Sequence, residues 1–445
     1  MTALAQAVQN LEAAPRLLET YVAAGRRYRD YVLQVPLDWN DPDGATIELF
    51  YREMVLAHLD GQQLPLMVYL QGGPGGQGPR PVGGSDRLDV ALERYRVILM
   101  DQRGTGRSTP VTAQVISEFP DGGSGAAYLE NFRADSIVAD AEAIRRRGYQ
   151  GRKWATLGQS YGGFLTLSYL SCFDNALSAC FITGGLPSLQ PSAAGVYART
   201  IHRVRAKNEQ FYRMYPQDRA RAANLARTLS EREVLLPDGD RFTVRRLQSL
   251  GIDFGMGSGF ERLHWLLELS GDGTGISDAL LQEVQARTSF AGNPLFAVLQ
   301  EDIYGNGANG PSAFAAQAEL ERHPEFATDA PTLLFAGEMM FRWTFEETRL
   351  LRPFIPAVEV LAARGTHRKI YDLEKIAANR VPMAAAVYYD DMYVDAGLSL
   401  DTAKQVGGLQ AWVTNEHEHD GINDPAVLRR LFAMVDEVGG PLAPR

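Results

Sequence analysis

Residues 154–170, WATLGQSYGGFLTLSYL, decide how this chain folds. The apolar run 154–157 predicts a short buried strand, and the mostly apolar residues from Phe164 onward predict a helix. Between them, Gly-Gln-Ser-Tyr-Gly at 158–162 predicts a sharp strand-to-helix turn, because a Cβ at either glycine would clash there. Such a turn pushes the Ser160 hydroxyl out of the sheet, where a neighbouring base can activate it as a nucleophile.

Further strands and helices alternate on both sides of this turn. Strand-like runs are found at 46–55, 64–70, 95–100 and 179–185, and a helix with apolar residues at helical spacing is predicted over 135–149. Several of the strands end at Gly-rich turns. The alternation favours a mainly parallel α/β sheet flanked by helices, in which a site forms beyond the carboxyl ends of the strands.

The pattern changes in the middle of the chain, where long helix-like stretches dominate residues 189–330. Strand-like runs return after it, at 331–337, 381–389 and 408–416. We therefore expect one discontinuous domain, in which residues 1–188 and 331–445 form the α/β core and residues 189–330 form an inserted helical cap.

Composition and charge exclude several classes of protein. Of 445 residues, 45% are hydrophobic and 22% are charged, which are ordinary values for a globular protein. The net charge of −10 and the lack of a Lys/Arg-rich block argue against a nucleic-acid partner. The sequence has no apolar run long enough to span a membrane and no signal-peptide pattern, so we expect a cytoplasmic protein. Cys172 and Cys180 lack metal-ligand spacing and are expected to be buried thiols.

A second Gly-rich turn, Gln-Gly-Gly-Pro-Gly-Gly at 71–76, directly follows a predicted strand. Acyl transfer needs backbone N–H groups aimed at the developing oxyanion, and glycines let the backbone approach the substrate. One donor is expected to be the N–H of Tyr161, the residue after the serine, and the other the N–H of Gly73. A plain tight turn is the alternative interpretation.

A third turn, Asp-Gln-Arg-Gly-Thr-Gly-Arg-Ser at 101–108, also follows a strand. It lacks the lysine and the spacing of a phosphate-binding loop. We expect a structural role, in which Asp101 and Arg103 bond within the turn and brace the neighbouring loop.

These three turns together resemble the proline iminopeptidase family of α/β-hydrolases. The match is tight over residues 60–165, and GEMMFRW, VPMAAAVYYDDMYVD and WVTNEHEHDG are similar to the longer members. The chain departs from the family at Gln71, where a histidine usually stands, which should alter hydrogen bonding within the loop. The resemblance implies an α/β-hydrolase fold with a helical cap and a serine peptidase that needs no metal or cofactor.

The catalytic base is sought among the histidines by chain order, which in this fold is serine, acid, histidine. Three of the seven histidines follow the predicted cap: His367, His417 and His419. The last two come just after the final predicted strand, where the base belongs. His419 begins His-Asp-Gly, which resembles the family's His-x-Gly turn, so we favour it over His417.

The acid should follow the preceding strand, where Asp390, Asp391 and Asp395 are available. The family's acid lies just past this strand, so Asp391 fits best, and it would hold the imidazole in one tautomer. A rival pair, Glu338 and His367, has similar spacing, but the sequence between them is helix-like and no final strand leads into the histidine.

An aminopeptidase must also hold the free amino group of its substrate, because burying an unpaired ammonium is costly. The resemblance implies glutamates from the cap and its junction with the sheet. LQEDIYGNG resembles the family's Glu-x-x-Tyr segment and nominates Glu301, and GEMMFRW nominates Glu338. Ordinary surface carboxylates are the alternative. Aromatic candidates for an apolar proline pocket, each of which could equally pack in the core, are Phe260, Trp265, Phe341 and Trp343.

The combined prediction is a serine aminopeptidase that releases an N-terminal residue, preferably proline, from peptides with a free N-terminus. An esterase or lipase-like hydrolase on the same fold is the alternative, since it would need the serine and histidine but no amine-binding glutamates. A binding protein that kept the fold without the activity is a third. The expected partner is a peptide substrate, neither a nucleic acid nor a membrane, and the oligomeric state stays open.

Overall fold

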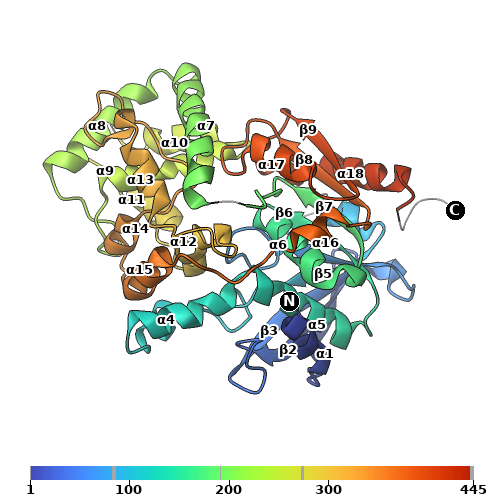
Figure 1. The fold of residues 1–445 in the computed structure, drawn as a ribbon. Helices are drawn as coiled ribbons and strands as arrows, with labels where there is room; N and C mark the ends of the chain where they lie inside the picture. Colours follow the sequence, from blue (N-terminus) through green and yellow to red (C-terminus); the bar gives the residue numbers. More distant parts are fainter. Residues whose placement is uncertain (1, 83–86, 191, 272–274, 441–445) are drawn as a thin grey trace.

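The computed structural model describes residues 2–82, 87–190, 192–271 and 275–440. Figure 1 shows a sheet with its flanking helices on one side and a group of helices on the other. Within these ranges the sheet has nine strands in the order β1-β2-β3-β5-β4-β6-β7-β8-β9. Their bounds are β1 Arg16–Ala23, β2 Arg26–Pro36, β3 Thr46–Leu56, β4 Leu66–Leu70, β5 Arg96–Met100, β6 Trp154–Gln159, β7 Leu177–Thr183, β8 Met383–Tyr388 and β9 Leu409–Thr414.

The six strands from β5 to β9 along the sheet pair in parallel, which confirms the mainly parallel α/β prediction. The first three strands pair antiparallel and extend one edge. The strands β1 and β2 were not predicted from the sequence. β1 is largely exposed, and β2 carries three Arg and two Tyr, so neither shows the continuous apolar run that marks a central strand.

Helices cover both faces of the sheet and bury its apolar side chains. On one face α1 (Thr2–Asn10), α5 (Ala134–Gly148) and α6 (Tyr161–Phe173) pack in a core with Val68 and Leu70. On the other, α2 (Arg87–Leu92) and α18 (Pro425–Glu437) pack with Met67 and Tyr69. Successive residues of β4 thus point to opposite faces of the sheet, and helices bury both faces.

The remaining helices lie between β5 and β6, between β7 and β8, or after β8. Their bounds are α3 Ala113–Ser117, α4 Gly122–Leu129, α7 Ala193–Met214, α8 Asp218–Glu231, α9 Val244–Ser249, α10 Gly259–Glu268, α11 Asp278–Thr288, α12 Pro294–Leu299, α13 Ala315–Glu321, α14 Arg342–Glu347, α15 Ile355–Ala363, α16 Leu373–Ala377 and α17 Ala396–Ala403. None of the helices in the described ranges is long and apolar enough to cross a membrane.

The prediction of a strand at 331–337 is wrong, because this segment adds no strand to the sheet. Helical side chains satisfy its backbone instead. Tyr212 Oη donates to the carbonyl of Leu333 at 2.6 Å, and Asn208 Nδ2 donates to the carbonyl of Phe335 at 2.9 Å. The apolar run is therefore buried among helices, and the sheet resumes only at β8.

The helices α7–α13 occupy the chain between β7 and this segment, and α14 and α15 lie beside them in Figure 1. The division into a core of 1–188 and 331–445 and a cap of 189–330 stays a prediction. Cys172 and Cys180 are buried free thiols, as expected.

Candidate active site

Ser160 stands alone between β6, which ends at Gln159, and α6, which begins at Tyr161. Its backbone has φ 55° and ψ −124°, a conformation that is strained for a residue with a Cβ. The turn closes only because its neighbours are glycines: a Cβ at Gly162 would collide with the carbonyl of Leu70. The sequence motif therefore forms the sharp turn that was predicted for it.

The loop after β4 passes directly against this serine. A Cβ at Gly72 would lie 2.9 Å from the Cβ of Ser160, and Gly73 has φ 126°, which favours glycine. On the other side of the serine, Tyr161 opens α6, and the first N–H groups of a helix have no partner within it. The structure thus places Tyr161 and Gly72, the residue before Gly73, next to the same serine, and the two oxyanion donors stay a prediction.

The Asp101 turn braces this loop. Asp101 accepts hydrogen bonds from the N–H of Gly78 at 2.9 Å and the N–H of Arg107 at 2.8 Å. Gln102 Nε2 donates to the carbonyl of Gln71 at 2.7 Å. The backbone at Gln71, where the chain departs from its family pattern, is therefore held by the neighbouring turn.

Arg103 does not bond within its own turn, so that expectation is wrong. Its guanidinium donates twice to Asp140, at 2.7 and 2.6 Å, and also to the carbonyls of Pro36, Leu37 and Asn131. A fully buried cation needs this many acceptors, which the short turn cannot supply.

His419 and Asp391 form a buried hydrogen-bonded pair. The distance from Nδ1 to Oδ2 is 2.6 Å, and the two residues are 2% and 1% exposed. The other carboxylate oxygen accepts from the N–H of Tyr393 at 2.7 Å and of Val394 at 3.1 Å. The Tyr393 ring meets the imidazole edge-on, with 4.7 Å between the ring centroids. The imidazole is therefore held with Nδ1 toward the carboxylate.

Burial lowers the pKa of His419, but the charge and hydrogen bond of Asp391, with further contributions from Glu338 and Asp420, outweigh it. The net result is a pKa above the ordinary value of 6.5. Such an imidazole accepts a proton readily and stays paired with its carboxylate when charged.

The turn after β7 connects this pair to the serine. A Cβ at Gly184 would lie 3.2 Å from His419 Nδ1, and a Cβ at Gly185 would collide with the carbonyl of Ser160. The N–H of Ser160 also donates to the carbonyl of Thr183 at 3.0 Å. The serine and the imidazole therefore border successive residues of one turn.

The alternative residues lie elsewhere. The ring of His417 packs edge-on against Tyr388 and Trp412, while Asp390 is paired with Arg203 at 3.0 Å and Asp395 caps α17. The rival pair is not brought together. His367 Nδ1 faces Asp302 at 3.3 Å, whereas Glu338 is close enough to His419 to alter its pKa.

Glu301 and Glu338 border one buried group of phenols. Burial raises the pKa values of Tyr197 and Tyr304, and the charges of both glutamates raise them further, as expected for carboxyl groups near these two rings. Burial raises the pKa of each glutamate to about 7. Glu301 Oε1 also accepts from the N–H of Ala316 at 2.9 Å, at the start of α13.

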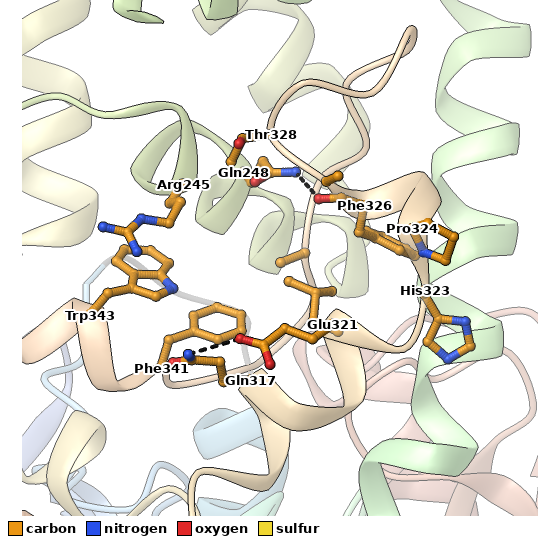
Figure 2. Close-up of a pocket in the computed structure, with 13 residues that line it drawn as sticks. Arg245, Gln248, Gln317, Glu321, His323, Pro324, Phe326, Thr328, Phe341 and Trp343 are labelled. Carbon is orange, nitrogen blue, oxygen red and sulfur yellow. Dashed lines mark hydrogen bonds between the residues drawn. The ribbon is translucent and has the colours of Figure 1, made fainter.

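The aromatic side chains near these carboxyls differ from those nominated by the sequence. Trp265 is 59% exposed, and Phe260 packs against Phe211 and Phe254 in the helical core. Phe341 and Trp343 stack at 5.1 Å and line the pocket of Figure 2, of about 290 Å³, which contains none of the candidate catalytic residues.

A row of aromatic rings, not predicted from the sequence, leads from the serine turn toward the glutamates. Tyr161 contacts Phe164, Phe164 contacts Tyr304, and Tyr304 contacts Tyr197, with centroid distances of 5.7, 6.2 and 6.3 Å. Tyr304 could have been predicted as a site residue, because it completes the Glu-x-x-Tyr segment. Tyr197 lies in the long helix α7, where no sequence motif distinguishes it. Within the described ranges, no group of three or more His, Cys, Asp or Glu side chains could hold a metal ion.

The chain is similar to known α/β-hydrolases. The α/β hydrolase fold family matches residues 65–242. A proline iminopeptidase of Aeromonas sobria is 41% identical over 93% of this chain and 98% of its own length. One of Aspergillus aculeatus is 31% identical over 97% of this chain and 99% of its own.

Among solved structures, a proline iminopeptidase of Mycobacterium smegmatis aligns with 92% of this chain and 99% of its own, at 13% identity and a TM-score of 0.43. That distant similarity adds nothing to the assignment, which rests on the two full-length relatives and on the sheet topology. The chain therefore belongs to the proline iminopeptidase family of α/β-hydrolases.

Proposed function

We propose that this chain is a serine aminopeptidase that releases the N-terminal residue of a peptide, preferably proline, through an acyl-enzyme. The observation that carries the proposal is the buried His419–Asp391 pair, which borders the same glycine turn as the strained Ser160. The full-length similarity to proline iminopeptidases supports the choice of substrate.

In the proposed reaction His419 takes the proton of the Ser160 hydroxyl, and the oxygen attacks the carbonyl of the first residue. Asp391 keeps the imidazole in one tautomer and stabilises the imidazolium. The N–H groups of Gly73 and Tyr161 stabilise the oxyanion. His419 then protonates the leaving amine, and water hydrolyses the acyl-enzyme by the same route.

Glu301 and Glu338 are proposed to hold the substrate's amino group and so limit cleavage to the first bond. Their pKa of about 7 means that each binds a proton readily when the site is empty. An arriving ammonium group favours the ionised carboxylate, because it supplies the opposite charge that the buried site lacks. We assign Glu338 the larger share, because one oxygen of Glu301 already accepts from Ala316.

The same proposal covers the substrate, the role of the helical segment and the location of the protein. The substrate is a peptide with a free N-terminus, the helical segment 189–330 acts as a cap that restricts entry, and the protein works in the cytoplasm. An esterase on this fold would have no use for two buried glutamates beside its phenols, which favours the peptidase over that alternative.

The test compares a prolyl amide, its N-blocked form and a simple acyl ester on the wild-type protein and Glu338→Gln. The wild type should cleave the free amide far faster than the blocked one. Glu338→Gln should raise KM for the free amide about tenfold or more, as expected for a lost charge-assisted bond. It should leave hydrolysis of the ester unchanged at a pH well above the pKa of His419, where the base is unprotonated in both proteins.

The matched control is Glu321→Gln, which changes an exposed glutamate of α13 in the same way. Its kinetics should equal those of the wild type. If Glu338→Gln cleaved all three substrates as before, the role of this glutamate in amine binding would be refuted. Equal wild-type rates on the free and blocked amides would refute the aminopeptidase assignment.

A further inference from the structure

A cavity of about 520 Å³ opens beside the candidate catalytic residues. Two of the residues that line it, Gln159 and Asp420, directly precede Ser160 and directly follow His419 in the chain. Its opposite wall comes from the helical part of the molecule. The cavity therefore lies next to both the serine turn and the histidine turn.

The helical wall contributes two arginines with different surroundings. Arg287 of α11 is paired with Asp253 at 2.5 Å and lies 3.5 Å from Glu283. For Arg262 of α10, the only ion pair within the described ranges joins Nε to Asp253 at 3.9 Å, beyond hydrogen-bond distance. Its side chain is 42% exposed. Arg262 thus presents a guanidinium to the cavity with most of its donors uncommitted.

The carboxylates of the same cavity are already engaged. Asp253 carries the short ion pair with Arg287, and Asp420 Oδ1 accepts from the N–H of Gly257 at 2.8 Å. Because these carboxylates are engaged within the protein, the charge left available to a ligand is positive. Arg262 supplies it from the helical wall. Arg87 also lines the cavity, but it already donates to Asn423 Oδ1 at 2.7 Å and to Tyr69 Oη at 3.1 Å. The cavity is therefore suited to an anionic group, and a planar guanidinium binds a carboxylate through two parallel hydrogen bonds.

The direction of the reaction indicates which part of a substrate reaches this cavity. The base that takes the serine proton returns it to the leaving amine, so the leaving peptide lies on the histidine side. Each extended residue spans about 3.4 Å, so the C-terminal carboxylate of a leaving group of one or two residues stays within roughly 7 Å of the scissile bond.

We propose that this cavity binds the leaving part of a short peptide and that Arg262 pairs with its C-terminal carboxylate. The inference rests on the proposed aminopeptidase function and extends it: the protein favours dipeptides and tripeptides with a free carboxylate over the same peptides with a C-terminal amide. Binding of this group lowers KM without entering the bond-breaking step.

The experiment measures kcat/KM for a prolyl dipeptide and for its C-terminal amide, on the wild type, Arg262→Gln and Arg262→Glu. The wild type should prefer the free acid about fivefold or more, as expected for one charge-assisted pair at a partly exposed site. Arg262→Gln should bring the two rates together by raising KM for the acid, and Arg262→Glu should reverse the preference.

Two controls separate this inference from the function on which it rests. Prolyl naphthylamide has no carboxylate, so its hydrolysis should be the same in the wild type and Arg262→Gln; a wild type inactive on it would refute the function itself. Arg241→Gln, at an arginine that is 61% exposed, should keep the wild-type preference. A wild type without preference for the acid, or an Arg262→Gln variant that keeps it, would overturn the proposed subsite.

Discussion

Two buried histidine–aspartate pairs in this molecule have nearly the same geometry and different surroundings. His419 and Asp391 are joined from Nδ1 to Oδ2 at 2.6 Å, and His264 and Asp218 are joined through the same atoms at 2.7 Å. All four residues are buried. The first pair lies beyond the sheet next to Ser160, whereas the second lies between α8 and α10 in the helical part.

The neighbours of each pair explain the difference in role. The imidazole of His264 stacks face to face on Tyr215, with 4.0 Å between centroids, and Asp218 also accepts from Arg221 at 2.8 Å. Asp218 and His264 thereby link two helices. His419 instead borders the glycine turn that also holds Ser160. A hydrogen-bonded pair alone thus does not mark a catalytic base; the group within reach of its second nitrogen does.

Removing each imidazole should separate the two pairs most strongly. His419→Asn should lower kcat/KM for a prolyl amide by about 10⁶-fold, as expected when the general base of a serine hydrolase is lost. His264→Asn should stay within about threefold of the wild type, because it touches no reacting group. Steady-state kinetics on both folded variants measures the contrast, and comparable losses in the two would contradict the distinction.

Removing each carboxylate should give a smaller difference in activity between the two pairs. One variant should lose activity and the other should lose stability. Asp391→Asn should lower kcat by about 10⁴-fold through the wrong tautomer of His419. Asp218→Asn should leave kcat nearly unchanged but lower Tm by about 2 °C or more, because His264 and Arg221 lose a buried partner. Thermal unfolding and kinetics of both variants check this, and a catalytic defect in Asp218→Asn would break the comparison.

The pH profile should sharpen the description of the His419 site. The general base must be unprotonated, so ester hydrolysis should rise with pH through the raised pKa of His419, above 6.5. Glu338 helps to raise that pKa, so Glu338→Gln should move the acid limb to lower pH. An ester without an amino group keeps substrate binding out of the measurement. An acid limb that stays in place or moves upward would contradict the electrostatic contact.

The smallest expected effect is a gain in the stability of Glu338→Gln at high pH, whereas Asp218→Asn should lose stability. The pKa of Glu338 is about 7 in the folded protein and 4.5 as its ordinary value, so the folded state binds more protons. Its stability contribution is therefore complete below pH 4.5 and is lost as the pH rises through about 7. Glu338→Gln should match the wild type at pH 4.5 and exceed its Tm by about 1–2 °C at pH 8, with Glu321→Gln unchanged at both. A Tm gain that did not grow with pH would contradict this.

Much of the fold could be predicted because each element left a local signal. The strands β4 to β9 are apolar runs that end in turns, and the turn at Ser160 needs glycines that no other residue can replace. The edge strand β1 was not predicted because an exposed edge does not need apolar residues, and β2 was not predicted because charged and polar residues interrupt its apolar pattern. The run 331–337 looked like a strand because burial among helices and burial in a sheet select the same residues.

The site was harder to predict where contacts join distant parts of the chain. Chain order and a short motif were enough to nominate His419 over His264, although both form buried aspartate pairs. No local pattern distinguishes Tyr197 from an ordinary core tyrosine of α7, or Arg262 from a surface arginine of α10. Their positions depend on how the helical part packs over the sheet, which the sequence around them does not encode.

The central claim is that Ser160 is a nucleophile activated by His419 and not by any other histidine. The most direct measurement is the rate of covalent labelling by a fluorophosphonate probe, followed by intact mass and peptide mapping. The account predicts one label at Ser160 in the wild type, an equal rate in His264→Asn, a strongly reduced rate in His419→Asn and none in Ser160→Ala. A wild type that stays unlabelled, or His419→Asn labelled as fast as the wild type, would contradict it.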